Sequence, residues 1–303
     1  MPSLRAFARA TDCRLVVTQP DRPGGRGQRL QPTPVKQVAR ELGIDTYEPE
    51  HLREALETLR AVRADLFAVA SYGKIVSRPI LELPRLGALN VHPSLLPRYR
   101  GATPLQAQLR DGVTTGGVTI ILMDSGMDTG DVVVQQSSPI GPSETYGELH
   151  DRFAALGAEL LARACALALE GKLERTPQAT LADPEAIAKT LTRPLQKTGL
   201  ELDWGASGAG IVNFVRSLAP APGARADLGG ERVKVLRATR ELDWTMIADP
   251  NVAPGTLLAA SADAALVKCG DGVVAVERLV PPNRGPVDGA SFARAHIAKR
   301  LSE

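Results

Sequence analysis

The first part of the chain alternates short apolar runs with segments of helical periodicity. The apolar runs have the length of strands, and between them the apolar residues recur every three to four positions. Such alternation is typical of an α/β domain, in which helices flank a parallel sheet. The pattern predicts these elements in turn at Leu15–Val17, Pro34–Leu42, Leu52–Val62, Leu66–Ala70, Ile80–Leu83 and Ala88–Val91, with a further apolar strand at Val118–Leu122.

A long amphipathic helix follows this alternation. Thr145 and Glu148 have the spacing of a capping box, in which each side chain binds a backbone N–H of the first turn. Gly171 is a natural end for this helix, because glycine readily adopts the left-handed conformation that closes a helix. The predicted buried face consists of Leu149, Phe153, Leu156, Leu160, Ala164 and Leu167.

The composition becomes polar and proline-rich after Gly171. We interpret residues 172–194 as a linker with one helical piece, which separates a first domain over residues 1–171 from a second over residues 195–303. The second domain begins with a helical pattern and continues with short apolar runs joined by glycine-rich turns, which predicts a small β-barrel. The helix carries Ile211, Phe214, Val215 and Leu218, the strands lie around Val233–Leu236, Thr256–Leu258, Leu266–Lys268 and Val273–Val276, and the hairpin turns lie at Gly229–Gly230 and Gly270–Gly272.

Composition and charge exclude several classes of protein. The chain of 303 residues has a formal net charge of +2, which is too small to indicate a nucleic-acid-binding protein by itself. It has no apolar run of membrane-spanning length, and we expect a cytoplasmic monomer. The cysteines are too far apart to pair as a CxxC site, and the histidines show no metal-ligand spacing, so we expect reduced thiols and no metal. These residues are Cys13, Cys165, Cys269, His51, His92, His150 and His296.

Two polar clusters follow apolar strands and contain the candidate chemistry. Asn90 and His92 end one strand, and Asp128 follows the strand Val118–Leu122. We expect both loops to leave the same edge of one sheet, where α/β domains bind ligands. An amide can donate to an oxyanion, an imidazole can pass a proton, and a carboxylate can raise the basicity of the imidazole.

The segment Asn90–Pro97, which reads Asn-x-His-x-Ser-Leu-Leu-Pro, and the later Asp-x-Gly-x-Asp-x-Gly-Asp of Asp124–Asp131 resemble the folate-dependent formyltransferases. The stretches Thr18–Gly27 and Arg98–Pro104 are similar to the members of that family that formylate methionyl initiator tRNA. The resemblance implies a Rossmann-like parallel sheet with a smaller C-terminal OB-like β-barrel. It also implies 10-formyltetrahydrofolate as formyl donor, initiator methionyl-tRNA as acceptor for translation initiation, and a catalytic trio of Asn90, His92 and Asp128.

The resemblance further suggests the binding residues. It implies a folate contact at Ser94, Leu95, Leu96 and Pro97, and another at Tyr72 and Gly73 after the strand Leu66–Ala70. The glycine-rich stretch Asp21–Arg29 is predicted to be a surface loop without regular structure, and its arginines are expected to contact tRNA. These arginines are Arg22, Arg26 and Arg29. The C-terminal domain is expected to bind tRNA as well, with Asp203–Trp204 near its start either contacting RNA or anchoring the domain.

Two alternative functions stay open. A formyltransferase could act on a small amine, such as a glycinamide ribonucleotide or an amino sugar nucleotide, with the same trio. A catalytically silent RNA-binding homologue is the other alternative, because the chain starts at Met1 within the first helix, whereas the family begins with a strand and a Gly-Thr-Pro turn. On this interpretation the first domain is N-terminally truncated and its folate pocket is incomplete. Gly24–Gly27 does not match a P-loop or a dinucleotide fingerprint, so we expect neither ATP nor NAD.

Overall fold

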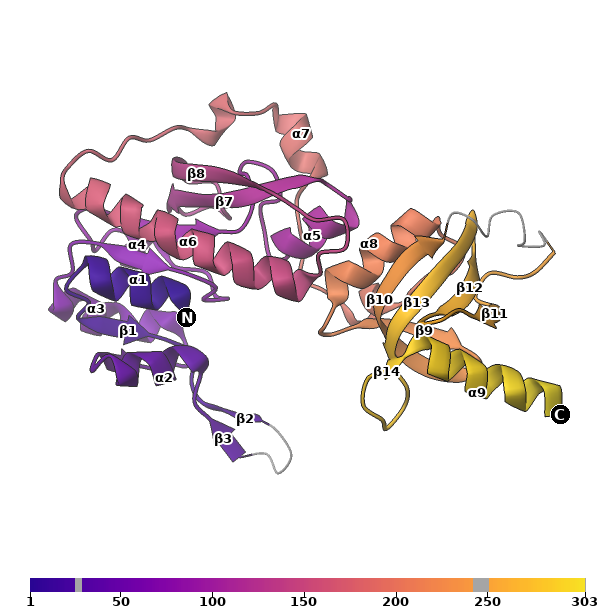
Figure 1. The fold of residues 1–303 in the computed structure, drawn as a ribbon. Helices are drawn as coiled ribbons and strands as arrows, with labels where there is room; N and C mark the ends of the chain where they lie inside the picture. The colour runs from indigo at the N-terminus through magenta and orange to yellow at the C-terminus, as the bar shows by residue number, and fades with distance from the viewer. Residues whose placement is uncertain (25–28, 242–250, 303) are drawn as a thin grey trace. The chain divides into compact units, whose positions relative to one another are not determined.

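The structure is a computed structural model that describes residues 1–24, 29–241 and 251–302. The chain forms two compact units (Figure 1). The first contains Met1–Ala102, Thr115–Pro139 and Asp151–Thr192, and the second contains Thr103–Thr114, Ile140–His150 and Arg193–Glu303. The predicted linker therefore belongs to the first unit as far as Thr192.

The main sheet of the first unit contains β5 (Phe67–Val69), β6 (Ala88–His92), β7 (Thr115–Leu122) and β8 (Asp131–Pro139), in that order. β5 and β6 are parallel, as the alternating pattern predicts. β7 is antiparallel to β6, and β8 is antiparallel to β7, so β6, β7 and β8 form a meander. The sheet is therefore mixed, with its parallel pair at the β5 end.

A second, smaller parallel pair joins β1 (Leu15–Val17) to β4 (Asp45–Tyr47). Among the described residues, no backbone pairing connects this pair to β5. The predicted strand at Leu15–Val17 is confirmed, a helix precedes it, and the helical patterns that follow it also form helices. These short helical elements are α1 (Pro2–Ala10), α2 (Pro34–Glu41), η1 (Leu52–Ala55), α3 (Leu56–Val62) and α4 (Arg78–Leu81).

The long helix α6 (Tyr146–Leu169) begins where the capping box predicts. Glu148 accepts from the Thr145 N–H at 2.8 Å, and Thr145 Oγ1 accepts from the Glu148 N–H at 3.4 Å. Gly171 closes the helix with φ +69°. In the middle of α6, a Cβ on Gly157 would lie 2.6 Å from Cγ1 of Val91, so the helix packs closely on β6 because this position has no side chain.

Both described ends of the stretch Asp21–Arg29 contain strand residues, so the prediction that it lacks regular structure is wrong there, while residues 25–28 lie outside the described residues. β2 (Arg22–Gly24) pairs antiparallel with β3 (Arg29–Gln31) (Figure 1). Pro23 is opposite Leu30. The buried ammonium of Lys36 lies 2.9 Å from a carboxylate oxygen of Asp21 and 2.9 Å from one of Glu48. This cation between two carboxylates links α2 to Asp21, the residue directly before β2.

The second unit is an antiparallel sheet covered by helix α8 (Gly208–Leu218). Its strands follow the order β11, β12, β13, β10 and β9, with β14 beside β13, and this path is open between β11 and β9 in the described residues. The predicted hairpins at Gly229–Gly230 and Gly270–Gly272 are confirmed. The strands are β9 (Ala224–Leu228), β10 (Glu231–Glu241), β11 (Leu257–Ala260), β12 (Ala265–Cys269), β13 (Gly272–Val280) and β14 (Val287–Asp288).

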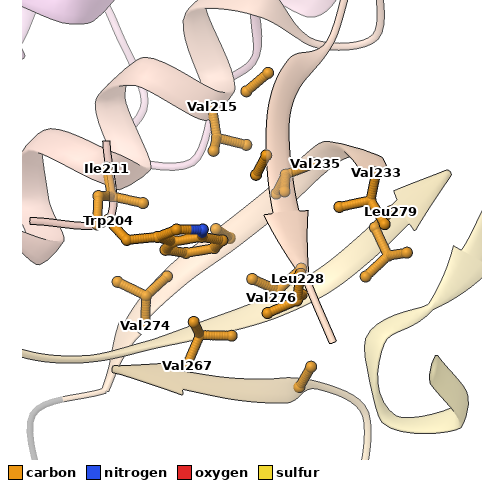
Figure 2. Packing of buried hydrophobic residues seen from close by; sticks show 14 of the residues in the cluster. Trp204, Ile211, Val215, Leu228, Val233, Val235, Val267, Val274, Val276 and Leu279 are labelled. Carbon is orange, nitrogen blue, oxygen red and sulfur yellow. The ribbon is translucent and has the colours of Figure 1, made fainter. Parts of the chain in front are cut away.

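Trp204 anchors the core of this second unit. Its side chain lies between Ile211 of α8 and Val274 of β13, and its indole N–H donates to the Asp227 carbonyl at 3.2 Å (Figure 2). Trp204 is 9% exposed, so the tryptophan of the Asp203–Trp204 pair packs in the core. The sequence pattern did not indicate the remaining helices α5 (Pro104–Arg110) and α9 (Gly289–Ser302).

Short helical elements continue beyond α6. They are η2 (Gln178–Thr180), α7 (Pro184–Lys189) and η3 (Lys197–Leu200). α7 is the helical piece expected within residues 172–194. In the described part of the chain, no helix combines the length and apolarity needed to cross a membrane.

The packing of α6 on the sheet yields a stability prediction. Phe153 is 1% exposed, so Phe153→Ala should lower the free energy of unfolding by about 3–5 kcal/mol through lost burial and a residual cavity. Arg163→Ala, on the exposed side of the same helix, should change it by less than about 0.5 kcal/mol. Urea titration followed by far-UV circular dichroism measures both, and equal losses in the two variants would contradict this assignment of the buried face.

Candidate active site

Strand β6 presents two polar side chains on one face. Asn90 and His92 are two residues apart, and alternate residues of a strand point to the same side. His92 is 4% exposed, and its Nε2 lies 2.9 Å from the carbonyl oxygen of Tyr99. Its other ring nitrogen, Nδ1, lies 3.6 Å from Oδ2 of Asp128. The structure therefore brings His92 and Asp128 together as the sequence predicted, with Asn90 beside His92 on the strand.

Asp128 is held from the opposite side by a backbone group. Its Oδ2 accepts from the Gly101 N–H at 2.9 Å, so one oxygen is shared between this donor and the imidazole. Asp128 itself has φ +55°, a left-handed conformation that non-glycine residues rarely adopt. Asp124 braces the same turn, because its Oδ1 accepts from the Gly126 N–H at 3.0 Å and from the Thr129 hydroxyl at 2.6 Å.

The expectation that both loops leave the same edge of the sheet is wrong. β7 runs antiparallel to β6, with Asn90 opposite Ile121 and His92 opposite Thr119. The chain therefore leaves β7 beside the start of β6, away from the end that carries His92. Asp128 reaches the imidazole because of the path of the loop from Met123 to Gly130, and not because of the direction of β7.

Burial and hydrogen bonding act on His92 in opposite directions. Burial lowers the pKa of the imidazole, because a charged ring loses its hydration in the interior. The Asp128 carboxylate raises that pKa through its negative charge, and the Tyr99 carbonyl raises it by accepting a hydrogen bond from the ring. Burial is the largest of these causes, and the pKa of His92 lies below its ordinary value. The ring lies between two acceptors, the Tyr99 carbonyl and the Asp128 carboxylate.

The segment Ser94–Pro97, expected to contact folate, is mostly enclosed by protein. Ser94, Leu96 and Pro97 are buried, and the Ser94 hydroxyl donates to the Arg98 carbonyl at 2.7 Å. Both backbone polar groups of Leu96 have hydrogen-bond partners within the protein. Its N–H donates to Thr119 Oγ1 at 3.1 Å, and its carbonyl accepts from Gln135 Nε2 at 2.9 Å. These groups shape the loop, and Leu95 is the half-exposed side chain within it.

The turn after β5 contains Tyr72 and Gly73. Ser71 and Gly73 both have positive φ, +49° and +74°, so the chain reverses sharply around the tyrosine. The Tyr72 hydroxyl is buried without a hydrogen-bond partner among the described residues, and burial raises its pKa. The Tyr72 carbonyl accepts from Gln19 Nε2 at 3.0 Å, which ties this turn to the segment after β1.

Of the three arginines expected to contact tRNA, the structure describes only one side chain. Arg22 is exposed at the start of β2, Arg29 lies in β3, and Arg26 lies outside the described residues. A surface pocket of about 590 Å³ lies beside the hairpin. Its lining includes Gln19, Arg22, Thr33, Gly73 and Lys74.

Three residues that sequence reasoning did not select also belong to this site. Gly101 donates to Asp128, Arg100 lies near the charges of Asp124 and Asp128, and Gln178 contacts the loop that carries Asp128. Gln178 falls in the segment interpreted as a linker, where nothing in the hydrophobic pattern marks it. In the described ranges, no group of three or more His, Cys, Asp or Glu side chains could hold a metal ion.

Comparison with known proteins agrees with this geometry. A family model described as formyl transferase matches residues 3–165, and one described as formyl transferase, C-terminal domain, matches residues 194–296. The chain belongs to the formyltransferase family. A methionyl-tRNA formyltransferase from Aromatoleum aromaticum is 40% identical, with 92% of this chain and 85% of that protein covered. One from Xanthomonas axonopodis pv. citri is 41% identical, with 97% and 94% covered.

Solved structures share the fold at lower identity. One is the N-formyltransferase from Helicobacter canadensis in complex with folinic acid and dTDP-3-aminofucose, with a TM-score of 0.66 and 18% identity. The match covers 91% of this chain and 94% of that protein. HypX from Aquifex aeolicus, in complex with tetrahydrofolic acid, has a TM-score of 0.62 and 17% identity. The match covers 94% of this chain and 47% of HypX, so this formyltransferase spans about half the length of HypX.

The contact between Asp128 and His92 predicts a change in titration. Because the carboxylate raises the pKa of the buried ring, Asp128→Asn should lower that pKa further below its ordinary value. NMR titration of the histidine ring signals measures the shift. The signals of His51, His150 and His296 serve as internal controls, and a His92 pKa that stays unchanged or rises would refute the electrostatic coupling.

Proposed function

We propose that this formyltransferase transfers the formyl group of 10-formyltetrahydrofolate to the α-amino group of methionyl initiator tRNA. The observation that carries the proposal is the arrangement of Asn90, His92 and Asp128 at one place in the first unit, with His92 Nδ1 3.6 Å from the carboxylate. Relatives with 40–43% identity named methionyl-tRNA formyltransferase support the choice of acceptor.

The reaction joins the amine nitrogen to the formyl carbon and breaks the bond from that carbon to N10 of the folate. The tetrahedral intermediate carries a negative oxygen, which needs hydrogen-bond donors. The Asn90 carboxamide donates to this oxygen, and His92 accepts a proton as the charge develops. Asp128 stabilises the charged imidazole, because a carboxylate beside a buried cation offsets part of its lost hydration.

The proton balance follows from the same groups. The attacking amine is neutral and loses one proton when the new amide forms, while N10 of the folate gains one as it leaves. His92 can accept the first proton, and its charged form can deliver the second. The net result is a formamide and tetrahydrofolate, with the enzyme returned to its starting protonation state.

Folate as cosubstrate is supported by the relatives and by the residues beside the trio. HypX and the Helicobacter canadensis protein are solved with tetrahydrofolic acid and folinic acid respectively. In this chain Leu95 is half-exposed in the loop after β6, and the Tyr72 hydroxyl is buried without a partner in the described part of the chain. A partly apolar pteridine ring with polar edges suits such surroundings.

The hairpin and the adjoining pocket support a tRNA acceptor. Arg22 and Lys74 line the pocket of about 590 Å³, and guanidinium and ammonium groups bind phosphate oxygens. A small amine needs no such protruding element. A formyltransferase acting on a glycinamide ribonucleotide or an amino sugar nucleotide is the competing function, and it predicts formylation of the free amine in the absence of tRNA.

The catalytic assignment predicts large losses of turnover. His92→Ala, Asn90→Ala and Asp128→Ala should each lower kcat for formyl transfer to methionyl initiator tRNA by about 100-fold or more, while the KM for the formyl donor changes little. Transfer of labelled formyl groups measures these values. A His92→Ala, Asp128→Ala double variant with wild-type turnover would eliminate the assignment.

The tRNA contact predicts a change in KM instead. Arg22→Ala should raise the KM for tRNA by about 3-fold to 10-fold, leave kcat close to wild type, and weaken the salt dependence of binding. Arg163→Ala, an exposed arginine on α6, is the matched control and should leave KM unchanged. If both variants behave alike, the hairpin does not bind the acceptor through this side chain.

A further inference from the structure

The segment between α6 and the second unit lies against the two loops that form the catalytic site. Thr176 and Val132 exchange two backbone hydrogen bonds, each 2.9 Å long, which adds a short bridge at the edge of β8. Further along, Thr192 N–H donates to the Arg100 carbonyl at 2.8 Å, and Thr190 Oγ1 accepts from the Tyr99 N–H at 3.1 Å. Residues 176–192 thus contact both the loop after His92 and the strand that follows Asp128.

Gln178 makes the closest contacts between this segment and the site. The residue is 2% exposed, and all hydrogen-bonding positions of its carboxamide are used. Its Nε2 donates to the Asp128 carbonyl at 2.8 Å and to the Gly130 carbonyl at 2.7 Å. Its Oε1 accepts from Nε and Nη2 of Arg100 at 2.9 and 2.7 Å. One buried amide therefore links the backbone around Asp128 to the arginine of the neighbouring loop.

These contacts fix a conformation that the backbone does not favour by itself. Asp128 has φ +55°, and its carboxylate reaches both Gly101 and His92 only if the turn stays in place. The two carbonyls bound by Gln178 flank Thr129, so the carboxamide clamps the turn on both sides. Arg100, whose charge lies near Asp124 and Asp128, is held in the same network.

We propose that Gln178 is a positioning residue, which acts on the reaction by holding Asp128 against His92. The catalytic part of this inference rests on the proposed function, whereas the effect on His92 does not. The side chain has the required chemistry, since only an amide supplies donors to two carbonyls and an acceptor to a guanidinium at once. A glutamate keeps the acceptor but loses both donors, and an asparagine is shorter by about 1.5 Å.

Two variants separate these contacts. Gln178→Met keeps the length and volume of the side chain and removes all of its hydrogen bonds. Gln178→Glu keeps the acceptor for Arg100 and removes both donors to the Asp128 turn. We expect each to lower kcat for formyl transfer by about 10-fold to 100-fold, with the KM for the formyl donor within about twofold of wild type. Gln136→Ala, an exposed glutamine on β8, is the matched control and should keep wild-type kinetics.

A double-variant cycle tests whether Gln178 acts through Asp128. In the Asp128→Asn background, Gln178→Met should produce little further change in kcat or in the pKa of His92, because the contact it protects is already removed. If the double variant instead lowers kcat by the product of the two single effects, Gln178 has a separate, merely structural role and the proposal is overturned. Wild-type activity in Gln178→Glu would also overturn it, because the contact with Arg100 would then suffice without the two donors to the Asp128 turn.

NMR titration of His92 gives a readout that does not depend on the substrate. Gln178→Met should lower the His92 pKa in the same direction as Asp128→Asn, because the carboxylate is no longer held beside the ring. An unchanged His92 pKa in the folded variant would refute the inference. Failure of the wild-type protein to formylate methionyl initiator tRNA would sink the proposed function and leave this titration result intact.

Discussion

The candidate catalytic site depends on the contact between the Asp128 carboxylate and the buried imidazole of His92. The two groups are 3.6 Å apart, and burial of the ring disfavours its charged form while the carboxylate favours it. The position of one carboxylate oxygen therefore contributes to the pKa of His92, against the larger effect of burial. Gly101 helps to fix that atom, because its N–H donates to the same oxygen at 2.9 Å.

Close backbone approaches make this placement possible. A Cβ on Gly101 would lie 2.2 Å from the Thr192 carbonyl oxygen, and one on Gly130 would lie 2.0 Å from the Leu122 carbonyl oxygen. Only glycine fits at such distances, so the Asp-x-Gly-x-Asp-x-Gly-Asp motif has a steric reason for its glycine before Asp131. The acidic residues of the motif differ in role. Asp124 braces the turn, whereas Asp128 faces the ring.

Much of the fold could be predicted from the hydrophobic pattern. The strand at Leu15–Val17, the capping box of Thr145 and Glu148 and the glycine hairpins of the second unit all follow from local rules that the structure obeys. The direction of β7 could not be predicted in this way, because an apolar run such as Val118–Leu122 fits a parallel or an antiparallel neighbour equally well. The pairing of β2 with β3 was missed because the proline and glycines around Arg22–Gly24 are typical of irregular loops and carry no strand pattern.

The site was predicted where its residues lie within a motif and missed where a distant segment supplies them. Asn90, His92 and Asp128 stand in short motifs, whereas Gln178 is 50 residues beyond Asp128 in a polar, proline-rich stretch. Ordering the three residues from Asp128 to Gly130 costs about 1–2 kcal/mol per residue in backbone entropy. A satisfied hydrogen bond contributes about 0.5–1.5 kcal/mol net. The two hydrogen bonds from Gln178 to this turn therefore offset part of the cost of holding it, so the segment that carries Gln178 helps to define the structure around Asp128.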